Sequence, residues 1–304
     1  MSARGLVALI LLMSQTAFAA ITLQDDTGRS ITLTHPARRI ISLAPHVTEL
    51  IYAVGAGAQL IGADSASDFP ASAKTLPRIG DYSRINFERV AALKPDLVIG
   101  WASGNRAADI YKLRQMGIPV MLTDAHRLTD VARLLRLVGN VTAHPDAGET
   151  AARAFEVGLS KLRAHYRTTT TRRVFYQVWD KPLMTIGGGH WINDAITLCG
   201  GRNIFADLNA ASPIVSLEAV VARMPEMIIS GSDAPDMRAM WRRFPRLPAV
   251  QRKALLRMNA DALHRPTPRL LNGVGVLCEQ IGATKSVVKL NQSAELPPTI
   301  DQAR

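Results

Sequence analysis

The stretch FERVAALKPDLVIG, residues 87–100, returns in altered form as LEAVVARMPEMIIS, residues 217–230. Each copy is typical of a short helix that stops before a proline and leads into a buried strand, because proline breaks a helix and a run of Val, Ile and Leu favours a strand. A glutamate stands second in both copies. The repeat predicts two related lobes that share one helix and strand building block.

Apolar bursts separated by helix-like segments surround both copies. They fall at 39–45, 60–64, 96–100 and 120–124 in the first half, and at 172–178, 226–230 and 254–260 in the second. This alternation predicts an α/β fold with parallel sheets and crossover helices. The run ITLQDDTGRSITL, 21–33, has DDTG between two alternating segments and predicts a β-hairpin that leads into the first lobe.

A single long helix is predicted between the halves, over residues 143–168. Its apolar residues recur at spacings of three and four, so that one face is apolar along its length. These residues are Ala152, Phe155, Leu159, Leu162 and Tyr166. A helix of about 20 residues is about 30 Å long, and we expect it to act as a stiff spine. The predicted organisation is a signal peptide at 1–19, an N-terminal lobe at 20–142, this helix, and a C-terminal lobe at 169–304 with a short irregular tail.

The first residues indicate export to the periplasm. Arg4 precedes an apolar run, and Ala17 and Ala19 provide the small residues of a cleavage site. In an oxidising compartment the two cysteines, Cys199 and Cys278, are expected to form a disulfide rather than two free core thiols.

Charge and motif content argue against several functional classes. The formal net charge is +11, but no basic run is interleaved with aromatic residues, so we expect a solvated basic surface and no nucleic-acid partner. Two cysteines cannot hold an iron–sulfur cluster, and no CxxC or HxxxH pairing suggests a zinc site. GxSxG, Walker and paired-carboxylate signatures are missing from the sequence. We predict neither an enzyme nor a resident cofactor.

Five segments, at 39–57, 64–70, 78–105, 198–207 and 264–278, resemble in order and spacing the helical-backbone periplasmic binding proteins. The resemblance is greatest to the members that bind cobalamin, although haem and ferric siderophore binders share PDLV at 95–98 and the Tyr82 region. It implies two Rossmann-like lobes joined by a long helix, a ligand cleft between them and little domain movement. It also implies a monomer that delivers a metal chelate to a dimeric ABC permease in the inner membrane.

The resemblance assigns a role to the two repeated glutamates. In the family a carboxylate on each lobe docks against arginines of the permease, and Glu88 and Glu218 match those positions. The alternative is that both are ordinary first-turn glutamates favoured by the helix dipole.

Three candidate ligand residues lie in the first lobe, where strands of open α/β sheets end. His46 either reaches the metal of a macrocycle or serves as a wall residue or helix cap. Tyr82 stands where the cobalamin binders have a tryptophan, and we expect it to stack on the ligand. With Arg84 two residues on, it could instead ligate haem iron, or it could simply pack. Trp101 matches a cleft tryptophan, with burial in the lobe core as the alternative.

The second lobe offers further candidates. Trp179 is expected at the end of the predicted strand 172–178, and His190 and Trp191 lie in a GGGHW loop that either closes over a ligand edge or turns the chain. Asp261 and Arg265 match residues that make polar contacts to the periphery of cobalamin, while Arg265 alone could be a surface charge.

The chain also departs from the cobalamin binders. Ala66, Ser212 and Ala262 stand where those proteins have aromatic rings. This predicts a wider cleft or a different cargo, unless Trp179 and Trp191 fill part of the wall.

Overall fold

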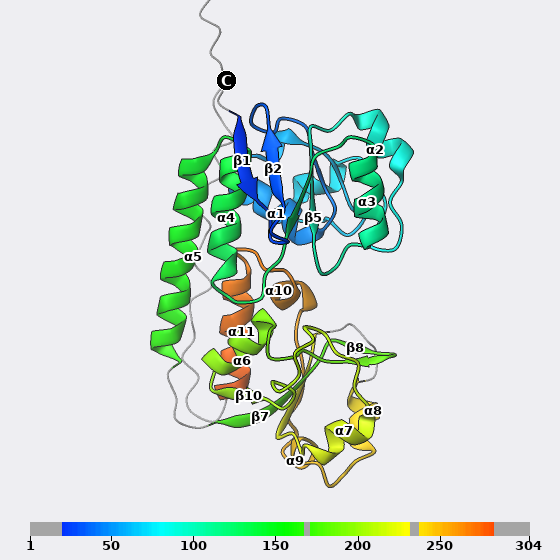
Figure 1. Cartoon of the computed structure of the whole chain (residues 1–304). Coiled ribbons are helices and arrows are strands. Elements are labelled where there is room, and N and C mark those ends of the chain that lie inside the picture. Colours follow the sequence, from blue (N-terminus) through cyan, green and yellow to red (C-terminus); the bar gives the residue numbers. More distant parts are fainter. Residues whose placement is uncertain (1–19, 167–170, 232–236, 283–304) are drawn as a thin grey trace, which may run out of the picture. The chain divides into compact units, whose positions relative to one another are not determined.

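The computed structural model describes residues 20–166, 171–231 and 237–282 (Figure 1). The predicted signal peptide and C-terminal tail lie outside the described residues. The chain divides into two compact units, Met1–Asp124 with Ala132–Ala152, and Ala125–Val131 with Arg153–Arg304. In the described part of the chain, no helix combines the length and the apolar character that crossing a bilayer would require.

The first unit holds a hairpin and a parallel sheet, as predicted. The hairpin pairs β1 (Ile21–Gln24) with β2 (Ser30–Leu33) in antiparallel register. The sheet has the order β4-β3-β5-β6. Its strands are β3 (Ile40–Ser42), β4 (Leu60–Ala63), β5 (Leu97–Trp101) and β6 (Val120–Thr123). Nearly all residues of these strands are buried, and most are apolar. Such strands are typical of a parallel sheet that is covered on both faces.

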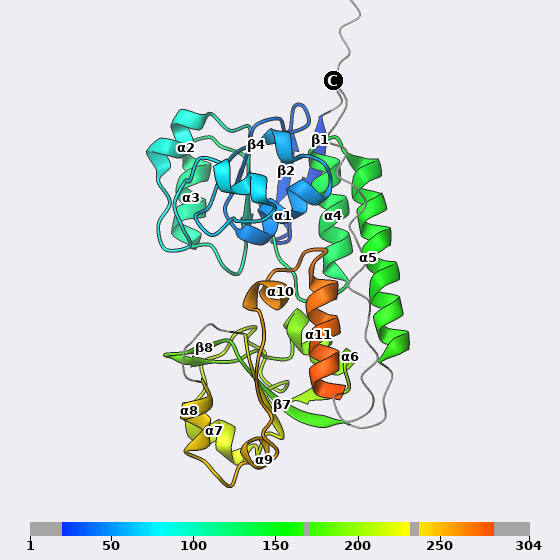
Figure 2. The same cartoon turned by 180° about the vertical axis from the view of Figure 1, so that it is seen from behind.

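Helices cover this sheet. They are α1 (Pro45–Ala53), α2 (Phe87–Leu93), α3 (Ala107–Gln115) and α4 (Asp130–Val141), with 3₁₀ turns at Gly57–Gln59 and Ala71–Thr75. Figures 1 and 2 show α2 and α3 side by side, and their buried residues Val90, Ile110 and Leu113 share one apolar core with strands β3, β5 and β6.

The second unit repeats the plan with a sheet of order β10-β7-β11-β12. Its strands are β7 (Arg172–Gln177), β10 (Gly201–Asn203), β11 (Met227–Ser230) and β12 (Leu255–Arg257), beside a small antiparallel pair, β8 (Trp179–Asp180) and β9 (Leu183–Met184). Its helices are α6 (Trp191–Leu198), α7 (Leu217–Ala222), α8 (Met237–Arg242), α9 (Pro248–Gln251), α10 (Ala260–His264) and α11 (Leu270–Gly282). Two α/β units with parallel sheets confirm the predicted fold class.

One uninterrupted helix, α5 (Pro145–His165), occupies most of the predicted 143–168 segment (Figures 1 and 2). Its residues through Ala152 belong to the first unit and those from Arg153 to the second. Ala152, Phe155 and Leu159 are buried, so the predicted apolar face is the face that packs.

The quoted repeat folds the same way in both units. The side chains of Asn86 and Ser216 cap α2 and α7 by accepting hydrogen bonds from the backbone N–H three residues on, at 2.9 and 3.1 Å. Lys94 and Met224 follow the ends of these helices with left-handed φ angles of 47° and 46°. The repeat is therefore a structural repeat, down to its capping and its exit turn.

A carboxylate after each helix ties the repeat to the strand beside it. Asp96 accepts hydrogen bonds from the backbone N–H groups of Arg38 and Arg39, at 2.8 and 3.0 Å. In the second unit Glu226 accepts one from the backbone N–H of Arg173, at 3.0 Å. The side chains of Arg39 and Arg173 return hydrogen bonds to carbonyls at the helix ends. Each unit thus closes its helix and strand block with the same reciprocal contact.

The predicted disulfide is present and joins two helical segments of the second unit. Cys199 follows α6 and Cys278 lies within α11, with their Cα atoms 4.5 Å apart.

Two predicted strands are shorter than expected, each for a local reason. The segment 39–45 keeps strand pairing only over β3, because Pro45 begins α1. The segment 254–260 contributes only β12, because the side chain of Asn259 caps α10 by accepting a hydrogen bond from the backbone of Asp261, at 2.9 Å. Strands β8, β9 and β10 were not predicted.

Candidate functional site

In the first unit, the carboxyl ends of β3 and β5 bring two predicted residues together. His46 is the second residue of α1 and is 5% exposed, and Trp101 is the last residue of β5. Their rings meet edge to face with centroids 5.3 Å apart. His46 therefore lies at a buried helix start, against an aromatic ring.

Trp101 is held on several sides. Its indole Nε1–H donates to Oδ1 of Asp124 at 3.1 Å, and its backbone N–H donates to the side chain of Asn105 at 2.7 Å. A Cβ atom at Gly104 would overlap the six-membered ring of the indole, so the glycine lets the backbone approach it. Trp101 is half-buried, so it is not a fully buried core residue.

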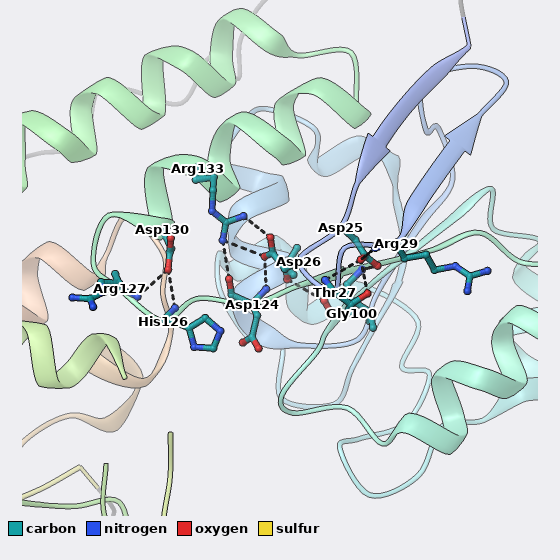
Figure 3. A network of polar contacts seen from close by, with 12 residues as sticks. Asp25, Asp26, Thr27, Arg29, Gly100, Asp124, His126, Arg127, Asp130 and Arg133 are labelled. Atoms are coloured by element: carbon teal, nitrogen blue, oxygen red, sulfur yellow. Dashed lines mark hydrogen bonds and ion pairs between the residues drawn. The ribbon is translucent and has the colours of Figure 1, made fainter. Parts of the chain in front are cut away.

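Asp124 is the residue in this region that sequence reasoning missed. It directly follows β6, and its backbone N–H donates to Asp26 at 2.5 Å. Asp26 is also held by Arg133, which donates to the carbonyl of Asp124 at 2.9 Å (Figure 3). Its place directly after the run VMLT is a signal that could have found Asp124.

The neighbouring turn of the hairpin is organised by Asp25. Its carboxylate accepts hydrogen bonds from Thr27, from the backbone of Arg29 and from the backbone of Leu122 (Figure 3). The hairpin predicted from DDTG is therefore attached to the end of β6 through both of its aspartates.

A buried chain of hydroxyl groups fixes the loop after β4. Thr48 Oγ1 lies 2.9 Å from the hydroxyl of Ser42 and 2.8 Å from that of Ser67, which in turn donates to Asp64. The backbone N–H of Ala66 donates to the same carboxylate at 3.1 Å. These hydrogen bonds fix the loop that carries Ala66.

Tyr82 is the most open of the candidate ligand residues and is 80% exposed. It lies in a turn that Asp81 organises by accepting hydrogen bonds from Ser83 and from the backbone of Arg84, and these bonds lower the pKa of the Asp81 carboxyl. Across the described chain, no ring contact links Tyr82 to His46 or Trp101. The turn presents its ring to solvent.

In the second unit Trp179 does not end the strand 172–178 as predicted. Strand β7 stops at Gln177, and Trp179 opens the small strand β8 with 54% of its side chain exposed. It pairs with Met184, which bridges to Ile214, an apolar residue that is 66% exposed. Trp179 and Ile214 therefore form an exposed apolar surface.

Asp261 and Arg265 lie at the two ends of α10 and pair with each other. Oδ1 of Asp261 is 2.9 Å from the guanidinium of Arg265. The Asp261 side chain is 48% exposed and the Arg265 side chain 11%. Arg265 is thus not a free surface charge.

The GGGHW segment is not an open loop at its last two residues. His190 caps α6 by accepting the Ile192 N–H, and Trp191 is buried and donates to the carbonyl of Leu263 at 2.8 Å. Burial lowers the pKa of His190 to about 3. Trp191 packs inside the second unit and fills no open wall.

A half-buried histidine, His264, lies beside Tyr176 in this unit. The hydroxyl of Tyr176 and Nε2 of His264 are 3.0 Å apart, and a Cβ atom at Gly231 would overlap both. Burial lowers the pKa of His264 to about 4 and raises that of Tyr176. Within the described residues, no group of three His, Cys, Asp or Glu side chains is arranged to hold a metal ion.

Glu88 and Glu218 are exposed and sit in the first turns of α2 and α7, two residues after the capping side chains. The structure thus gives both predicted docking residues the same local setting. Each is described within its own unit.

Known proteins resemble the chain in sequence and in fold. A family model described as "Periplasmic binding protein" matches residues 40–260. The vitamin B12-binding protein of Vibrio parahaemolyticus is 39% identical over 251 residues, which are 82% of this chain and 91% of that protein. The periplasmic vitamin B12 binding protein BtuF of Vibrio cholerae has a solved structure that matches with a TM-score of 0.76 at 39% identity, covering 82% of this chain and 98% of that one.

The fold of the chain also resembles that of a haem-binding protein. RhuT from Roseiflexus, a periplasmic heme-binding protein, matches with a TM-score of 0.72 at 24% identity, over 81% of this chain and 98% of that one. At this identity the match shows the fold alone. The family model spans most of this chain, and the chain belongs to the periplasmic binding protein family.

Proposed function

We propose that this chain binds cobalamin or a related corrinoid in the periplasm and delivers it to an ABC importer. The observation that carries the proposal is the 39% identity, over four fifths of the chain, to a vitamin B12-binding protein. The haem-binding neighbour is 24% identical. On this proposal the chain releases its ligand unchanged and is not an enzyme, and the segment 1–19 is its signal peptide.

The aromatic side chains described above suit a large, flat, rigid ligand. Such a disc loses little entropy on binding and favours preformed, mostly apolar contacts. Tyr82 and Trp179 expose their rings, each in its own unit, and Trp101 is fixed by its hydrogen bonds. We assign these rings to the macrocycle, His46 to the support of Trp101, and the Asp261 and Arg265 pair to the polar rim of the ligand.

Haem is the second candidate, because one observation favours it. Tyr82 is 80% exposed and has Arg84 two residues on. The phenolic oxygen of an exposed tyrosine with an arginine two residues on could ligate ferric iron. A ferric siderophore is the third candidate and has no such observation in its favour.

Calorimetry with three ligands decides among these candidates. We expect cyanocobalamin to bind with micromolar or tighter affinity, and hemin and a ferric hydroxamate to bind more weakly. The proposal is overturned if cyanocobalamin gives no heat while hemin produces a tyrosinate–haem absorption band that Tyr82→Phe removes.

Two substitutions test which rings contact the ligand. Tyr82→Ala and Trp179→Ala should each weaken cyanocobalamin binding by about tenfold, because an aromatic contact contributes about 0.5–1.5 kcal/mol beyond its buried area. Tyr111→Ala is the matched control, since Tyr111 is a 65% exposed tyrosine on α3 with no proposed role. Equal binding by all three variants would remove Tyr82 and Trp179 from the site.

We also propose that Glu88 and Glu218 dock the loaded protein onto the permease, which we take to be a dimer. Two carboxylates in equivalent settings suit a partner with two-fold symmetry through complementary charge. Their exposure and their identical places in the repeat support this role.

A further inference from the structure

Asp124 combines burial with a direct hold on a proposed ligand residue. It directly follows β6 and is 9% exposed. Its Oδ1 accepts the indole N–H of Trp101 at 3.1 Å and the hydroxyl of Ser103 at 2.8 Å. A carboxylate is a stronger acceptor than a neutral group, so these bonds constrain the indole more than an amide or carbonyl would.

The backbone of Asp124 is fixed from the opposite side. Its N–H donates to Asp26 at 2.5 Å, and its carbonyl accepts from Arg133 at 2.9 Å. Arg133 and Asp26 form an ion pair of their own, which closes a triangle around the end of β6 (Figure 3). The carboxylate of Asp124 is therefore held in one place before any ligand arrives.

Two further contacts hold the indole, and Asn105 holds the backbone of Trp101. Gly104 brings the backbone against the six-membered ring, and His46 meets the ring at 87°. Asn105 accepts the backbone N–H of Trp101 and donates to the carbonyl of Leu43 at 3.1 Å, which links the strand ends β3 and β5. With these contacts in place, the hydrogen bond from Nε1 is what selects one rotation of the ring.

We propose that Asp124 is a positioning residue that sets the orientation of the Trp101 indole for the ligand, with Gly104 as its backing. The inference rests on the proposed function, in which Trp101 contacts the macrocycle. A ring that is already oriented does not lose rotational freedom when the ligand binds, and this saving strengthens binding.

The first test compares substitutions at one position. Asp124→Leu removes the acceptor and should weaken cyanocobalamin binding by about tenfold, the effect of losing about 1.4 kcal/mol. Asp124→Asn keeps an oxygen acceptor and should retain most of the wild-type affinity for cyanocobalamin. Asp146→Leu, at an exposed position in the first turn of α5, is the control and should bind as wild type does.

A double-mutant cycle separates positioning from a direct contact. In a Trp101→Phe background the ring has no N–H, so Asp124→Leu should cause no further loss of affinity. An equal tenfold loss in both backgrounds would show that Asp124 acts on the ligand or on the fold rather than through Trp101, and would overturn the proposal.

The second readout needs no ligand. The indole N–H resonance of Trp101, assigned by its loss in Trp101→Phe, should be protected from solvent exchange in the wild type and in Asp124→Asn, and unprotected in Asp124→Leu. Unchanged protection in Asp124→Leu would overturn the inference. If cyanocobalamin fails to bind the wild type while the resonance behaves as expected, the proposed function fails and the orientation of Trp101 by Asp124 stands.

Discussion

The two units keep the same helix and strand block but end it differently. Asn86 and Ser216 cap, Val90 and Val220 are fully buried, and Asp96 and Glu226 hold the neighbouring strand, each pair 130 positions apart. At the carboxyl ends of the strands the likeness stops. In the first unit β5 ends in a tryptophan held by a buried carboxylate, whereas in the second β11 ends at Ser230, followed by a glycine against Tyr176 and His264.

The features that the two units share serve folding. The residues in which they differ lie beyond the strand ends, where a binding site can form. Caps, exit turns and the reciprocal carboxylate contact are needed wherever this block folds. The side chains beyond the strand ends serve no such common purpose, so the two units are free to differ there. Four experiments test how far the two units are equivalent.

The largest effect is expected from the disulfide, which only the second unit contains. Replacing Cys199 and Cys278 by serine opens a covalent link across 79 positions and should lower the free energy of unfolding by roughly 4.5 kcal/mol in the chain-entropy model. Hydrogen exchange should show this loss at the amides of β11 and less of it at those of β5. An equal loss at both strands would mean that the units unfold together.

Charge reversal at the docking glutamates tests the equivalence of the two units. Glu88→Lys and Glu218→Lys should each weaken docking to the permease by about tenfold, and the double variant should abolish uptake, while cyanocobalamin binding stays unchanged. Glu279→Lys, an exposed charge on α11, is the control. If one reversal has no effect, only one unit docks through its repeat. If ligand binding is lost in parallel, the glutamates serve the fold or the ligand site instead.

His190 and His264, whose pKa values are both lowered, should make the second unit sensitive to acid. Burial lowers the pKa of His190 to about 3 in the folded protein. Below pH 6.5 the unfolded chain therefore binds a proton at this residue that the folded chain does not bind. The contribution of the neutral histidine to the free energy of unfolding is therefore present above about pH 6.5. It is lost as the pH falls toward the pKa of the histidine in the folded protein. Between pH 7 and 5 the free energy of unfolding should fall by about 2 kcal/mol for each histidine that behaves this way.

His190→Asn isolates this contribution. Asparagine can cap α6 as the histidine does but does not titrate. The pH dependence measured by urea unfolding should be flatter in this variant. An unchanged slope between pH 7 and 5 would mean that His190 takes up its proton without unfolding.

The smallest effect is expected from the helix caps. Asn86→Ala and Ser216→Ala should each cost about 1 kcal/mol, since a capping side chain contributes about that much. The exchanges Asn86→Ser and Ser216→Asn should be nearly neutral, because both residue types cap well. Urea unfolding measures all four, and a large cost in one of the exchanges would show that the two caps are not equivalent.

Most of the fold could be predicted because its signals are local. Apart from β10, whose sequence is Gly-Arg-Asn, the strands of both sheets lie in apolar runs, and the helix α5 is indicated by its spacing of apolar residues. The errors arose where two local signals competed. Residues after Arg257 read as strand, but the cap at Asn259 turns the chain into α10.

The candidate site was harder to predict, because burial and partners depend on distant residues. Trp191 comes two residues after a run of three glycines and resembles a loop residue, yet it begins a helix and is buried. Asp124 could have been suspected from its place after a strand. Its support by Asp26 and Arg133 joins positions 107 residues apart, and no local pattern reveals such a contact.

The hairpin turn that supports Asp124 lies close to the predicted signal peptide. Strand β1 begins at Ile21, two residues after the predicted signal peptide, and Asp26 lies just beyond that strand. A chain trimmed past Asp26 would keep every strand of the β4-β3-β5-β6 sheet but lose the acceptor that holds Asp124. On the proposed function, a cleavage that removed Asp26 together with the predicted signal peptide would weaken ligand binding, because the folded protein would hold the Trp101 indole less firmly.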